Sequence, residues 1–311
     1  MQLNKLLAIP NLPMERVNMS VNQSAPKLLL GLIGSGIQQS LTPAMQEMEA
    51  SHQGLRVHYQ IIDLDLRKLG VEVLPHLVDS MRTIGFSGFN VTFPCKQAII
   101  PLLDELSEEA KAMGAVNTVI NRDGKLIGHN TDGSGWSMGF KNTLPNADLT
   151  KVVLLGAGGA GSAIAHAALR LGVKQLVIVD TDSKRCENLM NDLNALYGNR
   201  STYSLDIREA IVGATGLIHA TPTGMTKLPG LPLPEELITK NLWISEVVYF
   251  PIETELLKIA KARGCAVVNG GTMAVGQAVG AFELFTGKKA DTARVEAHFL
   301  SLLKKNEENK K

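Results

Sequence analysis

The chain contains 311 residues with a formal net charge of +1, of which 45% are hydrophobic and 20% charged. This length accommodates two domains of ordinary size, and the balanced charge excludes an electrostatic case for nucleic acid or an anionic membrane as a partner. The three cysteines, Cys95, Cys186 and Cys265, are too scattered for a disulfide framework or a metal site, which favours a reducing, cytoplasmic location. No apolar run reaches the roughly 20 residues of a membrane span, and the N-terminus lacks the pattern of a signal peptide.

Residues 1–132 predict a first domain in which strands and helices alternate, as in an α/β fold with mostly parallel sheets. Residues 1–25 show no clear period and are expected to form a flexible extension. The run KLLLGLIG (27–34) predicts a buried strand, and Thr42 is a candidate cap for the helix that follows. Asp123-Gly124 predicts the turn of a later hairpin.

A second alternating unit is expected over residues 133–270. From Lys151 the sequence KVVLLGAGGAGSAIAHAALRLGV reads as a strand, a glycine turn and a helix, and further strand and helix patterns follow. This order predicts a Rossmann-like, doubly wound dinucleotide-binding domain. Residues 271–311 are helical in pattern and form a third segment.

The glycines of the turn have the G-x-G-x-x-G spacing, which is a weak signal alone but a specific one between a strand and a helix. Gly156 permits the tight turn, Gly158 lets the backbone approach a pyrophosphate, and Gly161 lets the helix pack against the strand. The helix start then offers free N–H groups to the phosphates. The expected cofactor-binding residues here are Gly156, Ala157, Gly158, Gly159 and Ala160.

Asp180 ends the next strand, about 20 residues after the glycines. An acid there accepts hydrogen bonds from the adenosine ribose and repels a 2′-phosphate, so it favours NAD over NADP. Lys184 and Arg185 lie nearby and would offset part of that repulsion, so NADP stays the alternative; both also fit the exposed face of the following helix.

Polar residues gather where the strands of the first domain end and helices begin, which is where α/β folds bind ligands. Asn90 and Thr92 alternate with apolar residues, so both are expected on one face of a strand. The full set of candidates is Ser40, Thr42, Asn90, Thr92, Lys96, Asn117, Asp132, Tyr249 and Gln277.

Cys95 and Lys96 stand side by side after a proline break in GFNVTFPCKQAII, and either residue type can do chemistry. A catalytic thiolate needs an activating histidine or a helix dipole, and no histidine is close in sequence. The hypothesis therefore rests on Lys96, with Cys95 as a small neighbour.

Seven ordered motifs, NVTFPCK, GAVNT, NTDG, GAGGAG, ATPTGM, VVYFPIETELL and GGTMAVGQA, together resemble the shikimate dehydrogenase family over residues 27 to about 303. The resemblance implies that Lys96 and Asp132 form the catalytic pair. It also implies that Ser40 binds the substrate carboxylate and that Thr92, Asn117, Tyr249 and Gln277 contact the substrate. The last helices are then expected to return to the first domain.

The resemblance also implies which residues border the nicotinamide. Glu108, Val247 and Gly270 fall where family members touch or approach the cofactor, and Thr221 lies in the ATPTGM motif. Met273 is expected to pack in the core or against the nicotinamide. No metal site is expected, because the histidines, including His129 and His219, are not spaced as ligands.

Two departures resemble the NAD-dependent quinate/shikimate dehydrogenase branch. The carboxylate site reads Ser40-Leu41-Thr42-Pro43 where typical members have S-x-S-P, and the loop GSGIQQS lacks the usual Pro and His. The implied reaction is reversible oxidation of the ring 3-hydroxyl of shikimate or quinate, with a lysine moving the hydroxyl proton. Alternatives are an NADP-dependent biosynthetic shikimate dehydrogenase and a non-catalytic sensor of metabolite and dinucleotide. A homodimer is left open.

Overall fold

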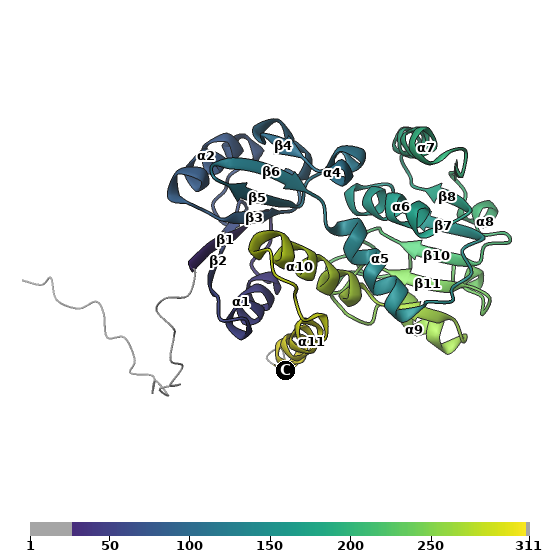
Figure 1. The fold of residues 1–311 in the computed structure, drawn as a ribbon. Helices are drawn as coiled ribbons and strands as arrows, with labels where there is room; N and C mark the ends of the chain where they lie inside the picture. Colours follow the sequence, from purple (N-terminus) through teal and green to yellow (C-terminus); the bar gives the residue numbers. More distant parts are fainter. Residues whose placement is uncertain (1–26, 309–311) are drawn as a thin grey trace, which may run out of the picture.

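The computed structural model describes residues 27–308, so the expected extension over residues 1–25 lies outside the described residues. Two lobes stand side by side in Figure 1, each built on its own six-stranded sheet. The fold is α/β with a Rossmann-like second lobe, as the alternating pattern predicts.

The first sheet has the strand order β2-β1-β3-β5-β6-β4 and is mixed rather than fully parallel. Strand β5 runs antiparallel to both of its neighbours. The β5–β6 turn is at Asp123 and Gly124, whose φ values of 53° and 87° suit an Asp-Gly dipeptide in a two-residue hairpin. The strands are β1 (Lys27–Gly34), β2 (Arg56–Asp63), β3 (Gly88–Val91), β4 (Glu105–Leu106), β5 (Thr118–Arg122) and β6 (Lys125–His129).

The two faces of this sheet are covered by segments from different parts of the chain. Ile33 faces a core that includes Val78 and Met81 of α2 (Leu74–Ile84), whereas Leu30 and Leu32 face a second core that includes Phe285 of α10 (Gly270–Thr286). This division follows the two-residue period of a strand. The helical segments of the lobe are α1 (Thr42–His52), η1 (Val71–Val73), α2 (Leu74–Ile84), α3 (Cys95–Ala98), η2 (Ile100–Leu102) and α4 (Glu108–Met113).

The second sheet is parallel throughout and has the order β12-β11-β10-β7-β8-β9, which is the doubly wound Rossmann order. Its strands are β7 (Lys151–Leu155), β8 (Gln175–Val179), β9 (Ser201–Ser204), β10 (Gly216–His219), β11 (Trp243–Glu246) and β12 (Ala266–Val268). Its helical segments are α6 (Gly159–Leu171), α7 (Ser183–Tyr197), α8 (Ile207–Ala210), η3 (Glu235–Leu237) and α9 (Glu255–Ala262).

Three helices connect the lobes: α5 (Asp132–Thr143), α10 (Gly270–Thr286) and α11 (Thr292–Glu308). Helices α5 and α10 cross closely because glycines stand at the contact: a Cβ on Gly135 would lie 2.6 Å from the backbone nitrogen of Gln277. Helix α11 packs against α1 of the first lobe, and Figure 1 shows both C-terminal helices beside that lobe. The expected return of the last helices to the first domain is confirmed.

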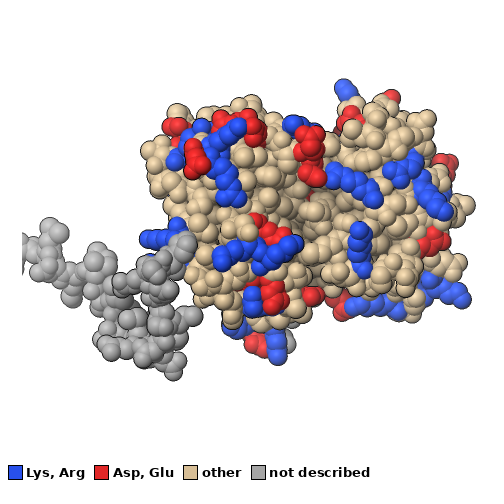
Figure 2. All heavy atoms as spheres, viewed as in Figure 1, with Lys and Arg blue, Asp and Glu red and all other residues tan. Residues whose placement is uncertain are grey.

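The surface has no single-sign face on the side visible in Figure 2, where basic and acidic residues are interspersed over both lobes. Within residues 27–308, no helix is both long and apolar enough to cross a membrane.

Candidate active site

Lys96 and Asp132 meet although 36 residues separate them in the chain: Lys96 Nζ lies 2.6 Å from Asp132 Oδ2. Lys96 is on the short helix α3 that follows β3, and Asp132 is the first residue of α5. The Asp132 side chain is 2% exposed and that of Lys96 is 22% exposed. A carboxylate this buried needs a cation and donors around it, and Lys96 supplies the cation.

Hydrogen bonds with neighbouring residues also fix the position of Asp132. Asn117 Nδ2 donates to Asp132 Oδ1 at 2.9 Å, and the Asp132 N–H donates to Asn130 Oδ1 at 2.9 Å. The Thr131 N–H donates to Asn117 Oδ1 at 2.8 Å, which sets the orientation of the Asn117 amide. Thr131, rather than Asp132, is the N-cap residue of α5, so the carboxylate is not consumed by capping.

Asn90 supports this network from the adjacent strand. Its Nδ2 donates to the Asn117 carbonyl at 3.1 Å and to Thr118 Oγ1 at 2.9 Å, while Tyr59 Oη donates to its Oδ1 at 2.6 Å. The Asn90 amide is therefore satisfied internally. Thr92 lies just past the end of β3, partly exposed, and it packs over Gly34 so closely that a Cβ on that glycine would collide with Thr92 Cγ2.

Ser40 and Thr42 lie at the start of α1. The Ser40 hydroxyl accepts a hydrogen bond from the Thr42 N–H at 3.3 Å, so Ser40 satisfies one free donor of the helix end. Thr42 is the first helical residue, and Leu41 is the N-cap residue without a side-chain hydrogen bond. The predicted capping role of Thr42 is therefore wrong, because the chain enters the helix one residue earlier.

Gln277 and Tyr249 approach from the C-terminal half of the chain. The Gln277 carbonyl lies 3.5 Å from Thr131 Oγ1, which places Gln277 beside the start of α5. The Tyr249 ring packs against Phe250 and Phe299, with centroids 4.8 and 6.3 Å away. Burial raises the pKa of Tyr249 above its usual value, so its hydroxyl stays protonated and can donate.

The glycine loop has the geometry that a dinucleotide needs. Gly156 has φ 100°, and a Cβ on it would lie 2.9 Å from the Ala220 carbonyl oxygen. A Cβ on Gly161 would collide with the Gly156 carbonyl, whereas one on Gly158 or Gly159 would meet nothing within 4 Å. The loop therefore presents open backbone at the start of the 13-residue helix α6, where a pyrophosphate would bind.

Asp180 follows β8 and turns back toward this loop. Its Oδ2 accepts from the Ala157 N–H at 2.8 Å and its Oδ1 from the Asp182 N–H at 3.0 Å. Burial opposes ionisation of Asp180, but these N–H groups and Arg185, whose Nη1 is 3.6 Å away, outweigh it and lower the pKa of the carboxyl below its usual value. Asp180 is therefore a carboxylate at neutral pH.

Thr221, Val247 and Gly270 lie at the carboxyl ends of neighbouring parallel strands. A Cβ on Gly156 would lie 3.1 Å from Thr221 Cγ2, and one on Gly270 would collide with the Val247 carbonyl oxygen. Met273 is 4% exposed and belongs to the core of the second lobe. Glu108 differs: its side chain is 86% exposed and pairs with Lys111 at 2.8 Å.

The site's two halves are joined through α5. A Cβ on Gly133 would lie 2.8 Å from the Ala163 carbonyl oxygen of α6, so Asp132 stands next to the helix that the glycine loop begins. Trp136 Nε1 donates to Ser245 Oγ of β11 at 2.9 Å. Asp132 and the glycine loop are thus carried by two directly packed helices, α5 and α6.

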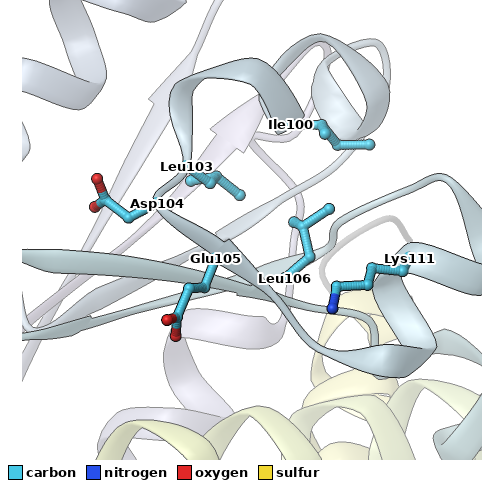
Figure 3. A pocket seen from close by; sticks show the side chains of 6 residues that line it. All are labelled: Ile100, Leu103, Asp104, Glu105, Leu106 and Lys111. Carbon is cyan, nitrogen blue, oxygen red and sulfur yellow. The ribbon is translucent and has the colours of Figure 1, made fainter.

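Two hollows are prominent in the described structure. One, of about 540 Å³, lies on the first lobe and contains no predicted site residue. Figure 3 shows its lining side chains, which come from η2, β4, the segment between them and α4. The other, of about 440 Å³, lies between the lobes and is lined by Asn130 and Thr131 next to Asp132, as well as by Arg170 of α6.

Cys95 has none of the features of a nucleophile. Its side chain is fully buried, and this burial raises the pKa of the thiol to about 11. His129, which could approach in space, has a lowered pKa from burial and makes no hydrogen bond with Cys95 among those described.

Sequence reasoning missed several supporting residues. Asp63 holds the loop before α1 by accepting from the Gly36 and Ile37 N–H groups, both at 3.0 Å, and from Gln38 Nε2 at 3.2 Å. An aspartate at the end of an apolar strand was the available signal. Tyr59 carried no local signal, because its partner Asn90 is 31 residues away.

Three protein-family models match the chain. Residues 32–119 match the shikimate dehydrogenase substrate binding domain, residues 140–193 match the ThiF family, and residues 270–298 match the shikimate 5′-dehydrogenase C-terminal domain.

Similar proteins are found among curated sequences and solved structures. A shikimate dehydrogenase (NADP(+)) from Streptomyces avermitilis is 50% identical over 88% of this chain and 95% of its own length. A quinate/shikimate dehydrogenase (NAD(+)) from Corynebacterium efficiens is 46% identical over 88% and 98%. The structure of quinate dehydrogenase from Corynebacterium glutamicum in complex with NAD superposes with a TM-score of 0.84 at 44% identity, covering 89% of this chain and 99% of that one.

Proposed function

The chain belongs to the shikimate dehydrogenase family, and from that premise we propose that it is an NAD-dependent quinate/shikimate dehydrogenase that reversibly oxidises the ring 3-hydroxyl of shikimate or quinate. The observation that carries the proposal is the contact between Lys96 and Asp132 at the junction with a dinucleotide-type glycine loop. A lysine held beside a buried carboxylate can donate a proton as the ammonium and accept one as the neutral amine, in a fixed position.

The chain's own residues account for the proton and the orientation of the ring. A bound nicotinamide would exchange the hydride with the ring carbon. During oxidation Lys96 in its neutral amine form takes the hydroxyl proton and becomes the ammonium; during reduction the ammonium gives the proton to the ketone oxygen, where its charge also stabilises developing negative charge. Asp132 holds the Lys96 amine and accepts from a substrate hydroxyl, and the Asn117 amide keeps Asp132 in place.

Asp180 supports NAD as the cofactor. Its carboxylate is ionised, lies next to the glycine loop, and would repel a 2′-phosphate on the adenosine ribose. The NADP alternative has its own support, because Arg185 lies within 3.6 Å of Asp180 and the Streptomyces relative is named for NADP. The Corynebacterium efficiens relative named for NAD and the Corynebacterium glutamicum structure in complex with NAD favour the first choice.

The segment around Ser40 supports the use of quinate. Quinate has an additional hydroxyl on the carbon that carries the carboxylate. The Ser40 hydroxyl and the partly exposed Thr42 lie together at the start of α1, at the position expected for that carboxylate. A threonine in place of serine keeps the hydroxyl but changes the space beside it.

Initial rates for shikimate and quinate, each with NAD and with NADP, test the proposal. We expect turnover of both acids, with NAD preferred.

Asp180→Ala should shift the NAD/NADP ratio of kcat/KM toward NADP by about tenfold, or roughly 1.4 kcal/mol. Glu187→Ala is the matched control for loss of an acid in the same region.

Strong NADP preference without quinate turnover would support the biosynthetic alternative instead. Dinucleotide binding without turnover of either acid would favour the sensor. A homodimer stays a prediction that light scattering would test.

A further inference from the structure

A buried histidine–carboxylate pair lies at the ends of the two strands that carry the expected nicotinamide contacts. His219 is the last residue of β10 and Glu246 the last of β11, and the two are register partners. His219 Nδ1 is 2.8 Å from Glu246 Oε1, and both side chains are fully buried. The proton chemistry described above uses neither residue.

Glu246 accepts hydrogen bonds from the chain on both of its oxygens. Oε1 accepts from the Val247 and Val248 N–H groups at 2.8 and 2.9 Å, and Oε2 accepts from Thr254 Oγ1 at 2.9 Å. A carboxylate has no hydrogen to give, so the His219 Nδ1–H must donate to it. The backbone that leads from β11 to the Val247 carbonyl is thereby fixed.

The other nitrogen of the ring acts on Thr221. With Nδ1 carrying the proton, Nε2 of a neutral ring is an acceptor, and Thr221 Oγ1 lies 2.5 Å from it. Thr221 therefore donates its hydroxyl hydrogen inward. Its oxygen also receives the Thr223 N–H at 3.3 Å, and it keeps acceptor capacity for a ligand.

Thr221 stands where a cofactor would pass. Its Cγ2 is close to the Gly156 turn, and Gly270 stands against the carbonyl of Val247, so all four positions share the carboxyl edge of the sheet. Dinucleotides bind at this edge, with the nicotinamide half beyond the pyrophosphate loop. Apolar residues of similar volume often give a protein stability equal to or greater than that from a buried ionisable pair, so stability alone does not explain this pair.

We propose that His219 and Glu246 are positioning residues for the nicotinamide half of the cofactor. The pair holds the Thr221 oxygen as a hydrogen-bond acceptor for a donor on that half of the molecule and fixes the Val247–Val248 backbone beside it. This inference rests on the proposed dehydrogenase function and names a part of its cofactor site.

Dissociation constants for NAD and for ADP, measured by calorimetry on the full chain, test this inference. ADP lacks the nicotinamide half, so it reports the fold and the adenosine site alone. Thr221→Val removes the hydroxyl with little change of shape and should weaken NAD about tenfold while leaving ADP within about twofold. Thr221→Ser keeps the hydroxyl and should restore NAD binding to near the wild-type value.

His219→Phe removes both ring nitrogens and should weaken NAD to a similar extent. Because both variants act through one hydroxyl, the double variant should lose little more than Thr221→Val alone, a coupling that independent sites do not show. If His219→Phe does not fold, the comparison of Thr221→Val with Thr221→Ser still tests whether the Thr221 hydroxyl binds the nicotinamide half, since His219 stays in place in both variants.

Unchanged NAD binding in Thr221→Val, or equal weakening of NAD and ADP in His219→Phe, would overturn the positioning role while wild-type turnover leaves the proposed function intact. Failure of the wild-type chain to bind NAD or to turn over either acid would instead overturn the proposed function, and this inference with it.

Discussion

Cys95 and Lys96 are adjacent in the chain, but one side chain is buried in the core and the other is in the candidate active site. Both follow the same proline break, but the Cys95 side chain points into the core of the first lobe, whereas Lys96 reaches Asp132. A thiol whose pKa is raised to about 11 is almost entirely protonated at pH 8, because ionisation would bury an unpaired charge.

Replacing each residue by alanine should separate them. We expect Lys96→Ala to lower kcat by a hundredfold or more, since it removes the proton carrier, and to change substrate affinity by less than roughly tenfold. Cys95→Ala should keep kcat/KM within about threefold and lose only some stability through a small cavity. Steady-state kinetics checks both, with exposed Lys125→Ala as the control; near-wild-type rates in Lys96→Ala would refute the proposed mechanism.

At the scale of elements, the loop between β1 and α1 has a shape that Asp63 imposes. Four donors converge on this one carboxylate, three of them from residues 36–38 and one from the Asp65 N–H at 3.1 Å. Burial raises the pKa of Asp63, but these hydrogen bonds outweigh it and lower the pKa below its usual value. The loop leads directly to Ser40, so the proposed carboxylate site depends on Asp63 without contact between them.

Asp63→Ala should therefore raise KM for shikimate and quinate about tenfold while KM for NAD stays unchanged. Releasing the loop lets Ser40 move, and the lost positioning appears in substrate affinity first. Asp65→Ala is the matched control, since its side chain is exposed two residues away. Equal effects of the two variants on substrate KM would contradict the prediction.

The last two helices of the chain pack on the first lobe, α10 on its sheet and α11 on α1. Glu49 of α1 is almost fully buried and receives Arg294 of α11 in a bidentate pair, with Nε to Oε2 at 2.7 Å and Nη2 to Oε1 at 2.9 Å. Gln53 and the Asp291 N–H donate to the same carboxylate. This cluster joins segments about 240 residues apart.

Arg294→Ala should lower the free energy of unfolding by about 2 kcal/mol, because it leaves Glu49 buried without its cation. The value is below that for a fully buried pair, since Arg294 is 32% exposed. Asp291→Asn keeps the N-cap acceptor of α11 and removes only an exposed ion pair, so its effect should stay within about 0.5 kcal/mol. Denaturant titration measures both; equal losses would show that the pair contributes no more than surface charge.

Features that depend on neighbours along the chain can be predicted from the sequence alone. The alternating pattern predicted the α/β class, Asp123-Gly124 predicted its hairpin, and the spacing from Gly156 to Gly161 predicted the strand–turn–helix unit. These succeed because a φ above zero or a close backbone approach is a local demand that few residues meet. The motif set indicated the family, which the relatives confirm.

Contacts between residues far apart in the chain follow from the folded arrangement and not from local pattern. Local pattern does not show that α10 covers a face of the first sheet, that Asp63 holds the loop before Ser40, or that His219 donates to Glu246 across adjacent strands. Such contacts are set by strand register and helix packing, which join residues far apart in the chain, and a side chain's partner is known only once those elements are placed together.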